Sequence, residues 1–290
     1  MSSIMENDFF VSQMKRVGDN IEIGENSYLD ESDELIHCSK CRGPMQSVID
    51  IDGELIKVPR MCKCRKEQHD KQEVERARIK ALDELERLRA ASLMDDKFFA
   101  STFESYDLTK HNAWPLKLCR RYVDGFDEML SKNQGLLLYG GVGTGKTHTA
   151  ACIANGLMSR GVSVVMTSFV KILQSVQGAR NDEDENALVG RLIRTKLLII
   201  DDLGAERSTD FALEKVYNVV DSRYRSGRPM ILTTNLTLEQ MQDATHIRYS
   251  RIYDRVFEVC YPIEFTGPSW RQKEAIVRRR AMEKLFEEVE

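Results

Sequence analysis

Residues 140–147 read Gly140-Gly141-Val142-Gly143-Thr144-Gly145-Lys146-Thr147. They fit the pattern G-x-x-x-x-G-K-[ST], with the apolar stretch GLLLYG (135–140) before them and the helix-like stretch THTAACIANGLMSR (147–160) after them. Glycines let successive backbone N–H groups converge on phosphate oxygens, and the N-terminus of a following helix adds partial positive charge. The stretch therefore predicts a strand, a phosphate-binding loop and a helix, in that order.

Three polar side chains at the end of this loop are candidates for nucleotide binding. Lys146 is expected to reach the β- and γ-phosphates. Thr147 is expected to offer its hydroxyl to Mg²⁺, which bridges phosphate oxygens and neutralises charge during phosphoryl transfer. We count His148, the next residue, with the nucleotide-binding residues.

Strand-like and helix-like segments alternate after Lys97, as in βα units around a parallel sheet. Most of the strand-like segments are apolar throughout, which is typical of strands buried on both faces. The acidic stretch 177–187 is expected to be an exposed loop. The pattern predicts an α/β fold with strands at 135–140, 163–168, 196–202, 229–235 and 257–265.

Two of these strands end in polar residues suited to phosphate chemistry. Asp201 and Asp202 end the strand 196–202, where one carboxylate would hold magnesium through its water shell. Asp202 is expected to polarise the attacking water, with Glu206 as a competitor for that role. Asn235 ends the strand 229–235 and could orient that water or sense the γ-phosphate, although Asn is also a common turn residue.

A cysteine cluster near the N-terminus has the spacing of a metal site. Four of the seven cysteines fall within 27 residues, as C-x-x-C and C-x-C pairs: Cys38, Cys41, Cys62 and Cys64. The stretch VIDIDGELIKV (48–58) between the pairs predicts a β-hairpin. Four thiolates can close a tetrahedral Zn²⁺ site, and a module this small needs a metal to stay folded. His37 and His69 could replace a cysteine, but we expect both to be exposed surface residues.

Differences in amino-acid composition divide the chain into four segments. These are a flexible acidic arm (1–35), a zinc-binding module (36–68), a linker helix (69–96) and an α/β nucleotide-binding domain (97–290). Apolar residues recur along the linker at mostly three-residue spacing, at Val74, Ile79, Leu82, Leu85, Leu88 and Leu93. This stripe fits either a solvated connecting helix or a helix that docks a partner.

Composition excludes several classes of protein. The chain of 290 residues has a formal net charge of −4, so no overall basic field attracts it to DNA or anionic lipid, and any nucleic-acid contact must be local. The N-terminus lacks a secretory signal, and no apolar run approaches a membrane-spanning length. We expect a soluble cytoplasmic protein with no membrane partner.

Five motifs resemble those of AAA+ ATPases, and specifically of DnaC/DnaI-type replicative helicase loaders and the related IstB-type transposition helper ATPases. The motifs lie between Phe98 and Arg271 and read GGVGTGKTHTA, LLIIDDLGAE, ILTTN, RIYDRV and FTGPSWR. The resemblance implies an AAA+ core, with a parallel sheet flanked by helices, that binds ATP and Mg²⁺. It makes residues 140–147 the Walker A motif, Asp201 and Asp202 the Walker B motif, and Asn235 sensor 1.

The resemblance also implies two arginine roles. Arg255 matches the arginine finger that reaches a neighbouring subunit's nucleotide, with Arg251 as the alternative, and Arg271 matches sensor 2. The chain departs from the common pattern because Asp202 replaces the usual Glu, and we therefore expect slow turnover that DNA or a partner stimulates.

Partners follow from the same resemblance. The zinc module is expected to bind a replicative hexameric helicase, and the ATPase domain to self-associate through its ATP sites and to hold single-stranded DNA. The stretch 169–173 with Lys171, and the basic run 278–280, are the candidate DNA contacts. Two other functions stay open: a transposition helper ATPase, and a zinc-dependent adaptor that uses nucleotide as a switch.

Overall fold

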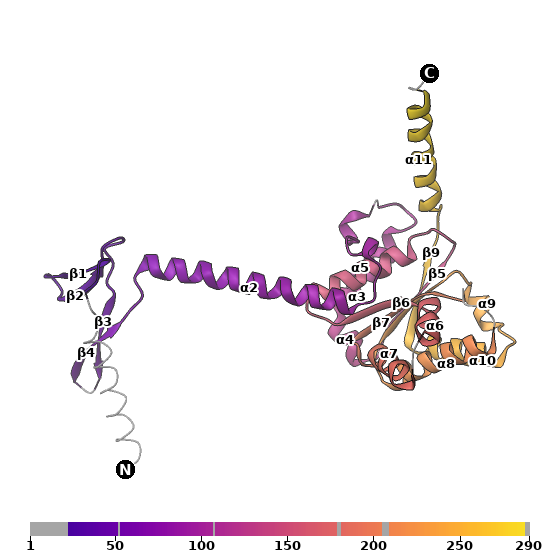
Figure 1. Ribbon diagram of the computed structural model, residues 1–290, viewed down its shortest axis with the longest axis horizontal. Coiled ribbons are helices and arrows are strands. Elements are labelled where there is room, and N and C mark those ends of the chain that lie inside the picture. The colour runs from indigo at the N-terminus through magenta and orange to yellow at the C-terminus, as the bar shows by residue number, and fades with distance from the viewer. Residues whose placement is uncertain (1–22, 52, 107, 179–180, 205–208, 288–290) are drawn as a thin grey trace, which may run out of the picture. The chain divides into compact units, whose positions relative to one another are not determined.

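The computed structural model describes residues 23–51, 53–106, 108–178, 181–204 and 209–287 (Figure 1). The chain divides into two compact units, residues 1–82 and 83–290. The division falls inside the helix α2 (Lys63–Ala91), within the segment predicted as a linker helix. Among the described residues, no helix is both long and apolar enough to cross a membrane.

The second unit is built on a five-stranded parallel sheet. The strands are β5 (Gly135–Gly140), β6 (Val164–Ser168), β7 (Leu197–Leu203), β8 (Met230–Thr234) and β9 (Cys260–Phe265). Their order is β6-β7-β8-β5-β9, so β8 lies between β7 and β5. The sequence prediction placed all five strands correctly in order, and the fold class is confirmed.

Helices cover both faces of this sheet (Figure 1). They are α3 (Ala113–Asp124), α4 (Phe126–Ser131), α5 (Lys146–Met158), α6 (Phe169–Gln177), α7 (Asp182–Arg194), α8 (Asp210–Arg225), α9 (Leu238–Gln242), α10 (Ile247–Val259) and α11 (Trp270–Glu287). Alternate strand residues point to opposite faces of the sheet. Leu136 and Leu138 pack in one apolar cluster with α3 and α5, whereas Leu137 packs in the other with α6, α8 and α10.

Two sequence predictions in this unit are wrong. The stretch 177–187 was predicted as a loop, but most of it is helical, because α7 begins at residue 182. The Asn181 side chain accepts the Asp184 N–H and so caps the helix, and acidic residues in the first turn favour a helix N-terminus. Residues 257–259 end α10 instead of beginning a strand. Their helix buries Ile252, Val256 and Val259 at helical spacing, and that packing extends it to the start of β9.

The first unit consists of two antiparallel hairpins and the first part of α2. The hairpins are β1 (Ser27–Asp30) with β2 (Leu35–Cys38), and β3 (Gln46–Ile51) with β4 (Glu54–Pro59). The hairpin predicted within 48–58 is confirmed, in a register that pairs Ile49 with Ile56. The predicted flexible arm is wrong for residues 27–35, since they belong to the first hairpin; residues 1–22 lie outside the described part of the chain.

The helix α2 has no buried residue. Val74, Ile79 and Leu82 are exposed by half or more, whereas Leu85 and Leu88 pack against the core of the second unit. The apolar stripe of the linker therefore has two parts: Val74, Ile79 and Leu82 are exposed to solvent, and Leu85 and Leu88 are covered by the core of the second unit.

A buried arginine joins the start of two sheet strands to the end of a helix. Arg223 is 0% exposed and donates to the carbonyl oxygens of Leu192, Ile193, Thr195, Lys196 and Pro229, at 2.6–3.2 Å. These carbonyls end α7 and precede β7 and β8. Burial lowers the pKa of Arg223 to about 9, and the partial negative charge of the carbonyls takes the place of a carboxylate.

Replacing Arg223 should destabilise the second unit strongly. Arg223→Met keeps the apolar stem but leaves five buried carbonyls without their donor, so we expect the free energy of unfolding in urea to fall by about 3–5 kcal/mol. Arg225→Met removes an exposed guanidinium that pairs with Asp221, which keeps its second partner Arg255, and should cost less than about 1 kcal/mol. Equal losses in the two variants would contradict a structural role for the buried guanidinium.

Candidate functional site

The loop between β5 and α5 has the backbone that a phosphate-binding loop needs. Gly140 and Gly143 adopt φ of 129° and 78°, which favour glycine. A Cβ on Gly140 would lie 2.2 Å from the Phe265 carbonyl oxygen, and one on Gly143 would lie 2.1 Å from the Ser269 hydroxyl. Both glycines are therefore required by close neighbours as well as by backbone conformation.

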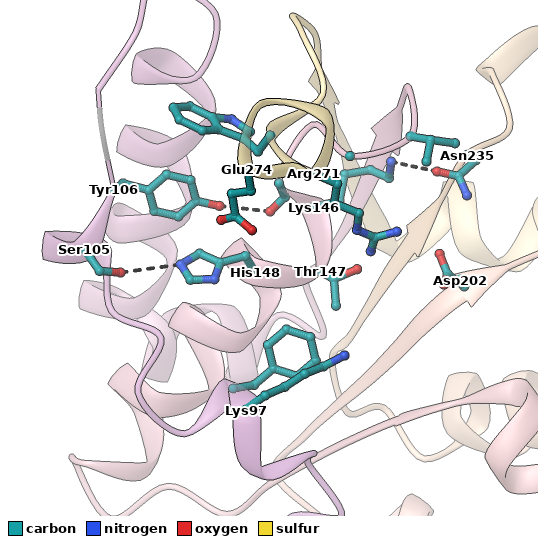
Figure 2. A pocket seen from close by; sticks show the side chains of 15 residues that line it. Lys97, Ser105, Tyr106, Lys146, Thr147, His148, Asp202, Asn235, Arg271 and Glu274 are labelled. Atoms are coloured by element: carbon teal, nitrogen blue, oxygen red, sulfur yellow. Dashed lines mark hydrogen bonds between the residues drawn. The ribbon is translucent and has the colours of Figure 1, made fainter. Parts of the chain in front are cut away.

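The Lys146 side chain is held by oxygens of the loop and of Asn235, the residue after β8. Its ammonium donates to the carbonyls of Gly140 and Gly141, both at 2.8 Å, and to Asn235 Oδ1 at 2.9 Å (Figure 2). Burial lowers the pKa of Lys146, and the charges of Asp202 and Asp201 oppose that shift. A phosphate that binds this loop can take the place of these oxygens around the ammonium.

Thr147 and Asp201 lie in direct contact, as residues that share a magnesium ion should. The Thr147 hydroxyl donates to Asp201 Oδ1 at 2.8 Å, and the Thr233 hydroxyl donates to the same oxygen at 2.6 Å. Burial raises the pKa of Asp201, while these two hydrogen bonds favour its charged form. A hydroxyl and a carboxylate oxygen are the hard ligands that suit Mg²⁺.

The neighbouring Asp202 is turned into the pocket by a bulge in β7. It has a φ of 56°, and the pairing of β7 with β8 shifts register between Ile200 and Leu203. Its N–H donates to Thr233 Oγ1 at 2.9 Å. Thr233 thus contacts both of the aspartates that were predicted as the Walker B pair. Thr233 was not predicted as a site residue, although two polar threonines within an otherwise apolar strand could have indicated it.

A pocket of about 490 Å³ brings most of the predicted residues together (Figure 2). The loop and α5 contribute Val142, Gly143, Gly145, Lys146, Thr147 and His148. Three other segments contribute Asp202, Asn235 and Arg271. Gly140, Gly141 and Thr144 lie in the loop itself, where the Thr144 hydroxyl donates to the Gly141 carbonyl. Glu206, the competitor of Asp202, lies outside the described residues.

Arg271 reaches the pocket from the first turn of α11. The N–H of Trp270 donates to the Gly143 carbonyl at 2.9 Å, so the start of this helix is fixed to the phosphate loop. Trp270 and Glu274 also line the pocket, and neither was predicted. In the sequence, only their proximity to Arg271 could have indicated that these two residues line the pocket.

A segment before α3 forms another wall, which was not predicted from the sequence. The Tyr106 hydroxyl donates to the Gly145 carbonyl at 2.9 Å and lies 2.6 Å from Thr149 Oγ1. His148 lies within hydrogen-bond distance of the hydroxyls of Ser101 and Ser105, at 3.3 and 3.4 Å. Burial lowers the pKa of His148. The segment 101–106 is therefore fixed against the first turns of α5.

The candidate arginine fingers do not line this pocket. Arg255 Nη2 lies 2.6 Å from Asp221 Oδ1 and donates to the Tyr217 hydroxyl at 3.0 Å. Arg251, one turn earlier on α10, is exposed, and its side chain has no hydrogen bond or ion pair within the described part of the chain. A finger acts on a neighbouring subunit's site, so the choice between the two stays a prediction.

Of the candidate DNA-contact stretch 169–173, Phe169, Ile172 and Leu173 are buried in the core, and the basic side chains of both candidate segments have acidic neighbours. Lys171 pairs with Asp95. On α11, Arg278 lies 4.0 Å from Glu274, and Arg279 lies 3.3 Å from Glu283. These pairs are solvated, so they leave the arginines available without adding support for DNA binding.

The four clustered cysteines of the first unit have the geometry of a metal site. Their sulfurs all lie within 4.8 Å of one another, and Cys64 Sγ is 3.4 Å from Cys62 Sγ and 3.6 Å from Cys38 Sγ. Zinc bonds of about 2.3 Å in a tetrahedron place sulfurs about 3.8 Å apart, so the cluster fits Zn²⁺. Backbone N–H groups of Cys41 and Lys40 lower the pKa of Cys38, and those of Cys64 and Gly43 lower the pKa of Cys41 to about 6.

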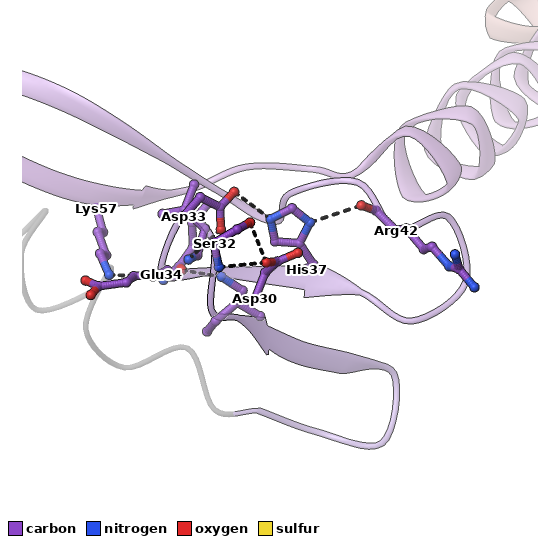
Figure 3. A network of polar contacts seen from close by, with 10 residues as sticks. Asp30, Ser32, Asp33, Glu34, His37, Arg42 and Lys57 are labelled. Atoms are coloured by element: carbon purple, nitrogen blue, oxygen red, sulfur yellow. Dashed lines mark hydrogen bonds and ion pairs between the residues drawn. The ribbon is translucent and has the colours of Figure 1, made fainter.

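His37 does not belong to this metal cluster. Its Nδ1 lies 3.0 Å from the Arg42 carbonyl, and its Nε2 lies 2.9 Å from Asp33 Oδ2 (Figure 3). Both partners accept hydrogen bonds, and together they raise the pKa of His37. The prediction that His37 is exposed is wrong, since its ring is buried in this polar network, whereas His69 is exposed as predicted.

Comparison with known proteins identifies the family to which this chain is similar. The profile of the family described as IstB-like ATP binding protein matches residues 71–277. An ATP-binding protein in an insertion sequence of Mycobacterium tuberculosis (strain ATCC 25618 / H37Rv) is 26% identical over 66% of this chain and 78% of its own length. The replicative helicase loader DnaC of Escherichia coli (strain K12) is 32% identical over 49% of this chain and 56% of its own length. The crystal structure of DnaI is similar over 61% of this chain and 94% of that chain, with a TM-score of 0.52 and 26% identity.

Thr233 should matter for hydrolysis more than for nucleotide binding. Thr233→Val keeps the volume but removes both contacts to the Walker B pair, so we expect kcat for ATP hydrolysis to fall about 10- to 100-fold with little change in metal-free nucleotide affinity. Thr234→Val is the matched control, because among the described residues that hydroxyl bonds to the Leu203 carbonyl and to the Leu236 N–H and not to either aspartate. A similar kcat in the two variants would contradict the role of Thr233.

The cysteine cluster should hold one zinc ion for each chain. Cys64→Ser removes a ligand, and we expect the purified protein to lose its stoichiometric zinc and the ordered structure of the first unit. Elemental analysis measures the metal, and limited proteolysis reports on the fold. Cys119→Ala is the control, since Cys119 is 0% exposed in the core of the second unit. Full zinc content in the Cys64 variant would rule out the four-cysteine site.

Proposed function

We propose that this chain, which belongs to the family of IstB-like ATP binding proteins and is an ATPase, loads a hexameric replicative helicase onto single-stranded DNA. The observation that carries the proposal is the combination of this ATPase core, which is similar to that of a replicative helicase loader, with a separate cysteine-cluster unit. A loader needs one part that holds the helicase and another that responds to ATP. We place this activity in the cytoplasm.

In the ATP cycle, each residue of the pocket has a defined task. Lys146 would exchange Asn235 for phosphate oxygens, which frees the amide to face the γ-phosphate. Thr147 and Asp201 would hold Mg²⁺, which neutralises the charge of the phosphates. Asp202 would accept a proton from the attacking water, and its shorter side chain in place of Glu fits slow turnover.

Assembly through the ATP sites would supply the remaining positive charge. Arg255 is our candidate for the finger that stabilises transition-state charge in a neighbouring subunit, and Arg251 is the alternative. Arg255 would have to exchange Asp221 for phosphate, whereas Arg251 has no described partner to leave. Arg271 would contact the nucleotide of its own subunit, because it lines that pocket.

The hairpins of the first unit offer an apolar surface for the helicase. Leu29, Val48 and Leu55 are 52%, 47% and 71% exposed, although they lie on strands. Val48 pairs with Lys57 and Leu55 pairs with Asp50 across the same hairpin, so polar groups border the apolar ones. Apolar residues bordered by polar ones are typical of surfaces that bind proteins.

A transposition helper ATPase is the second candidate. It is favoured by the family match and by the relative that belongs to an insertion sequence. This function predicts ATP-dependent polymers on DNA and a transposase as partner. An adaptor that uses nucleotide as a switch would instead hydrolyse ATP negligibly, even with DNA and helicase present.

Light scattering of the chain mixed with the replicative helicase of its own host tests the proposal. We expect a complex of defined stoichiometry that Lys146→Ala retains, because the helicase contact lies in the first unit, and that Leu55→Glu weakens at least about tenfold. Lys146→Ala should lose ATP binding. No helicase complex, together with ATP-dependent polymers on DNA, would favour the transposition helper and overturn the loader.

A further inference from the structure

The start of α2 carries a concentration of positive charge that the ATPase cycle does not use. The stretch 57–71 has six basic residues and only two acidic ones, in a chain whose net charge is −4. Arg60, Lys63 and Lys66 line a hollow of about 710 Å³, together with Met61, His69 and Asp70. All three cations are exposed. We propose that this hollow binds the phosphate backbone of single-stranded nucleic acid.

The cations of the hollow are not neutralised by the chain itself. None of Arg60, Lys63 and Lys66 forms an ion pair or a side-chain hydrogen bond with another described residue. The acidic residue at its edge, Asp70, lies 3.7 Å from His69 Nδ1 instead. Unpaired cations around a concave surface attract a polyanion, and the attraction is local because the rest of the protein is acidic.

The cysteine cluster does not account for these charges. The hydrogen bonds to the Cys38 and Cys41 sulfurs come from backbone N–H groups of residues 40, 41, 43 and 64 and from the thiols of Cys62 and Cys64, and no lysine or arginine side chain contributes. The cluster instead fixes the backbone that presents the cations. The Lys66 N–H donates to the Cys62 carbonyl at 2.9 Å, and the Arg60 N–H donates to the Met45 carbonyl at 2.7 Å.

The composition of the hollow favours phosphate over a protein partner. Lysine is depleted in protein–protein interfaces, where aromatic and other large apolar residues supply the binding energy, and here Met61 is the large apolar side chain among the lining residues. Lysine and arginine dominate contacts to nucleic-acid phosphates. The exposed Val48 and Leu55, which we assign to the helicase, lie on the second hairpin outside this lining.

Fluorescence anisotropy with a labelled oligothymidylate tests the inference on the full-length chain without nucleotide, so that the result does not depend on ATP-driven assembly. Arg60→Gln/Lys66→Gln removes two cations and leaves the cysteines and their neighbour Lys63 intact. The control, Arg78→Gln/Lys80→Gln, removes two exposed cations of α2 that lie outside the hollow. Zinc content should be equal in the three proteins.

We expect the Arg60/Lys66 variant to bind about tenfold more weakly at about 0.1 M salt, and its log–log salt slope to be smaller by about 1.4, the value for two lost contacts to a single strand. The control should stay within about twofold of the wild type. Equal affinity and slope in the two variants would overturn the proposal. Displacement of the oligonucleotide by polyglutamate as effectively as by unlabelled oligothymidylate would also overturn it, in favour of an acidic protein partner.

The same variants separate this inference from the proposed function. Leu55→Glu should leave the oligonucleotide affinity unchanged, and Arg60→Gln/Lys66→Gln should leave the helicase complex intact. A failure to bind any helicase would therefore refute the loader without touching the nucleic-acid contact. Loss of the helicase complex in the Arg60/Lys66 variant, with unchanged oligonucleotide affinity, would refute the contact alone.

Discussion

The parallel pairing of β8 between β7 and β5 is the constraint on which the nucleotide site depends. Parallel strands end at the same edge of a sheet, so this order brings the glycine loop after β5, the aspartates at the end of β7 and Asn235 after β8 to one place. The polar contacts among these three segments follow from that alignment, including the bond from Lys146 to Asn235 across 89 residues of sequence. Arg223 fixes the opposite ends of β7 and β8.

The sequence predicted those features whose residue types serve few structural purposes. Glycines at positive φ, buried strands of continuous apolar residues and paired cysteines each serve few structural purposes, and the loop, the sheet and the cysteine cluster were all anticipated. Prediction from the sequence failed where partners distant in sequence decide the outcome. Thr233 and Tyr106 gain their importance only from the atoms they contact, and no local pattern marks those contacts.

Two of the elements predicted wrongly, α7 and the first hairpin, have a common cause. The acidic stretch before Leu188 and the segment 27–35 both have exposed, polar sequences, which by composition favour loops. In the structure, side-chain caps and tight turns order them: Asn181 begins α7, and Asp33 accepts the Leu35 N–H in the first hairpin. Local hydrogen bonds of this kind need no buried apolar face, so hydrophobic periodicity does not detect them.

The chain that leaves α2 is fastened to α5 at successive turns of that helix. Asn155 donates to the carbonyls of Phe98 and Ser101, His148 lies against Ser101 and Ser105, and the Tyr106 hydroxyl donates to the Gly145 carbonyl. Gly145 is the last glycine of the phosphate loop. The position of the phosphate loop and the position of the segment 98–106 are therefore set by the same group of hydrogen bonds along α5.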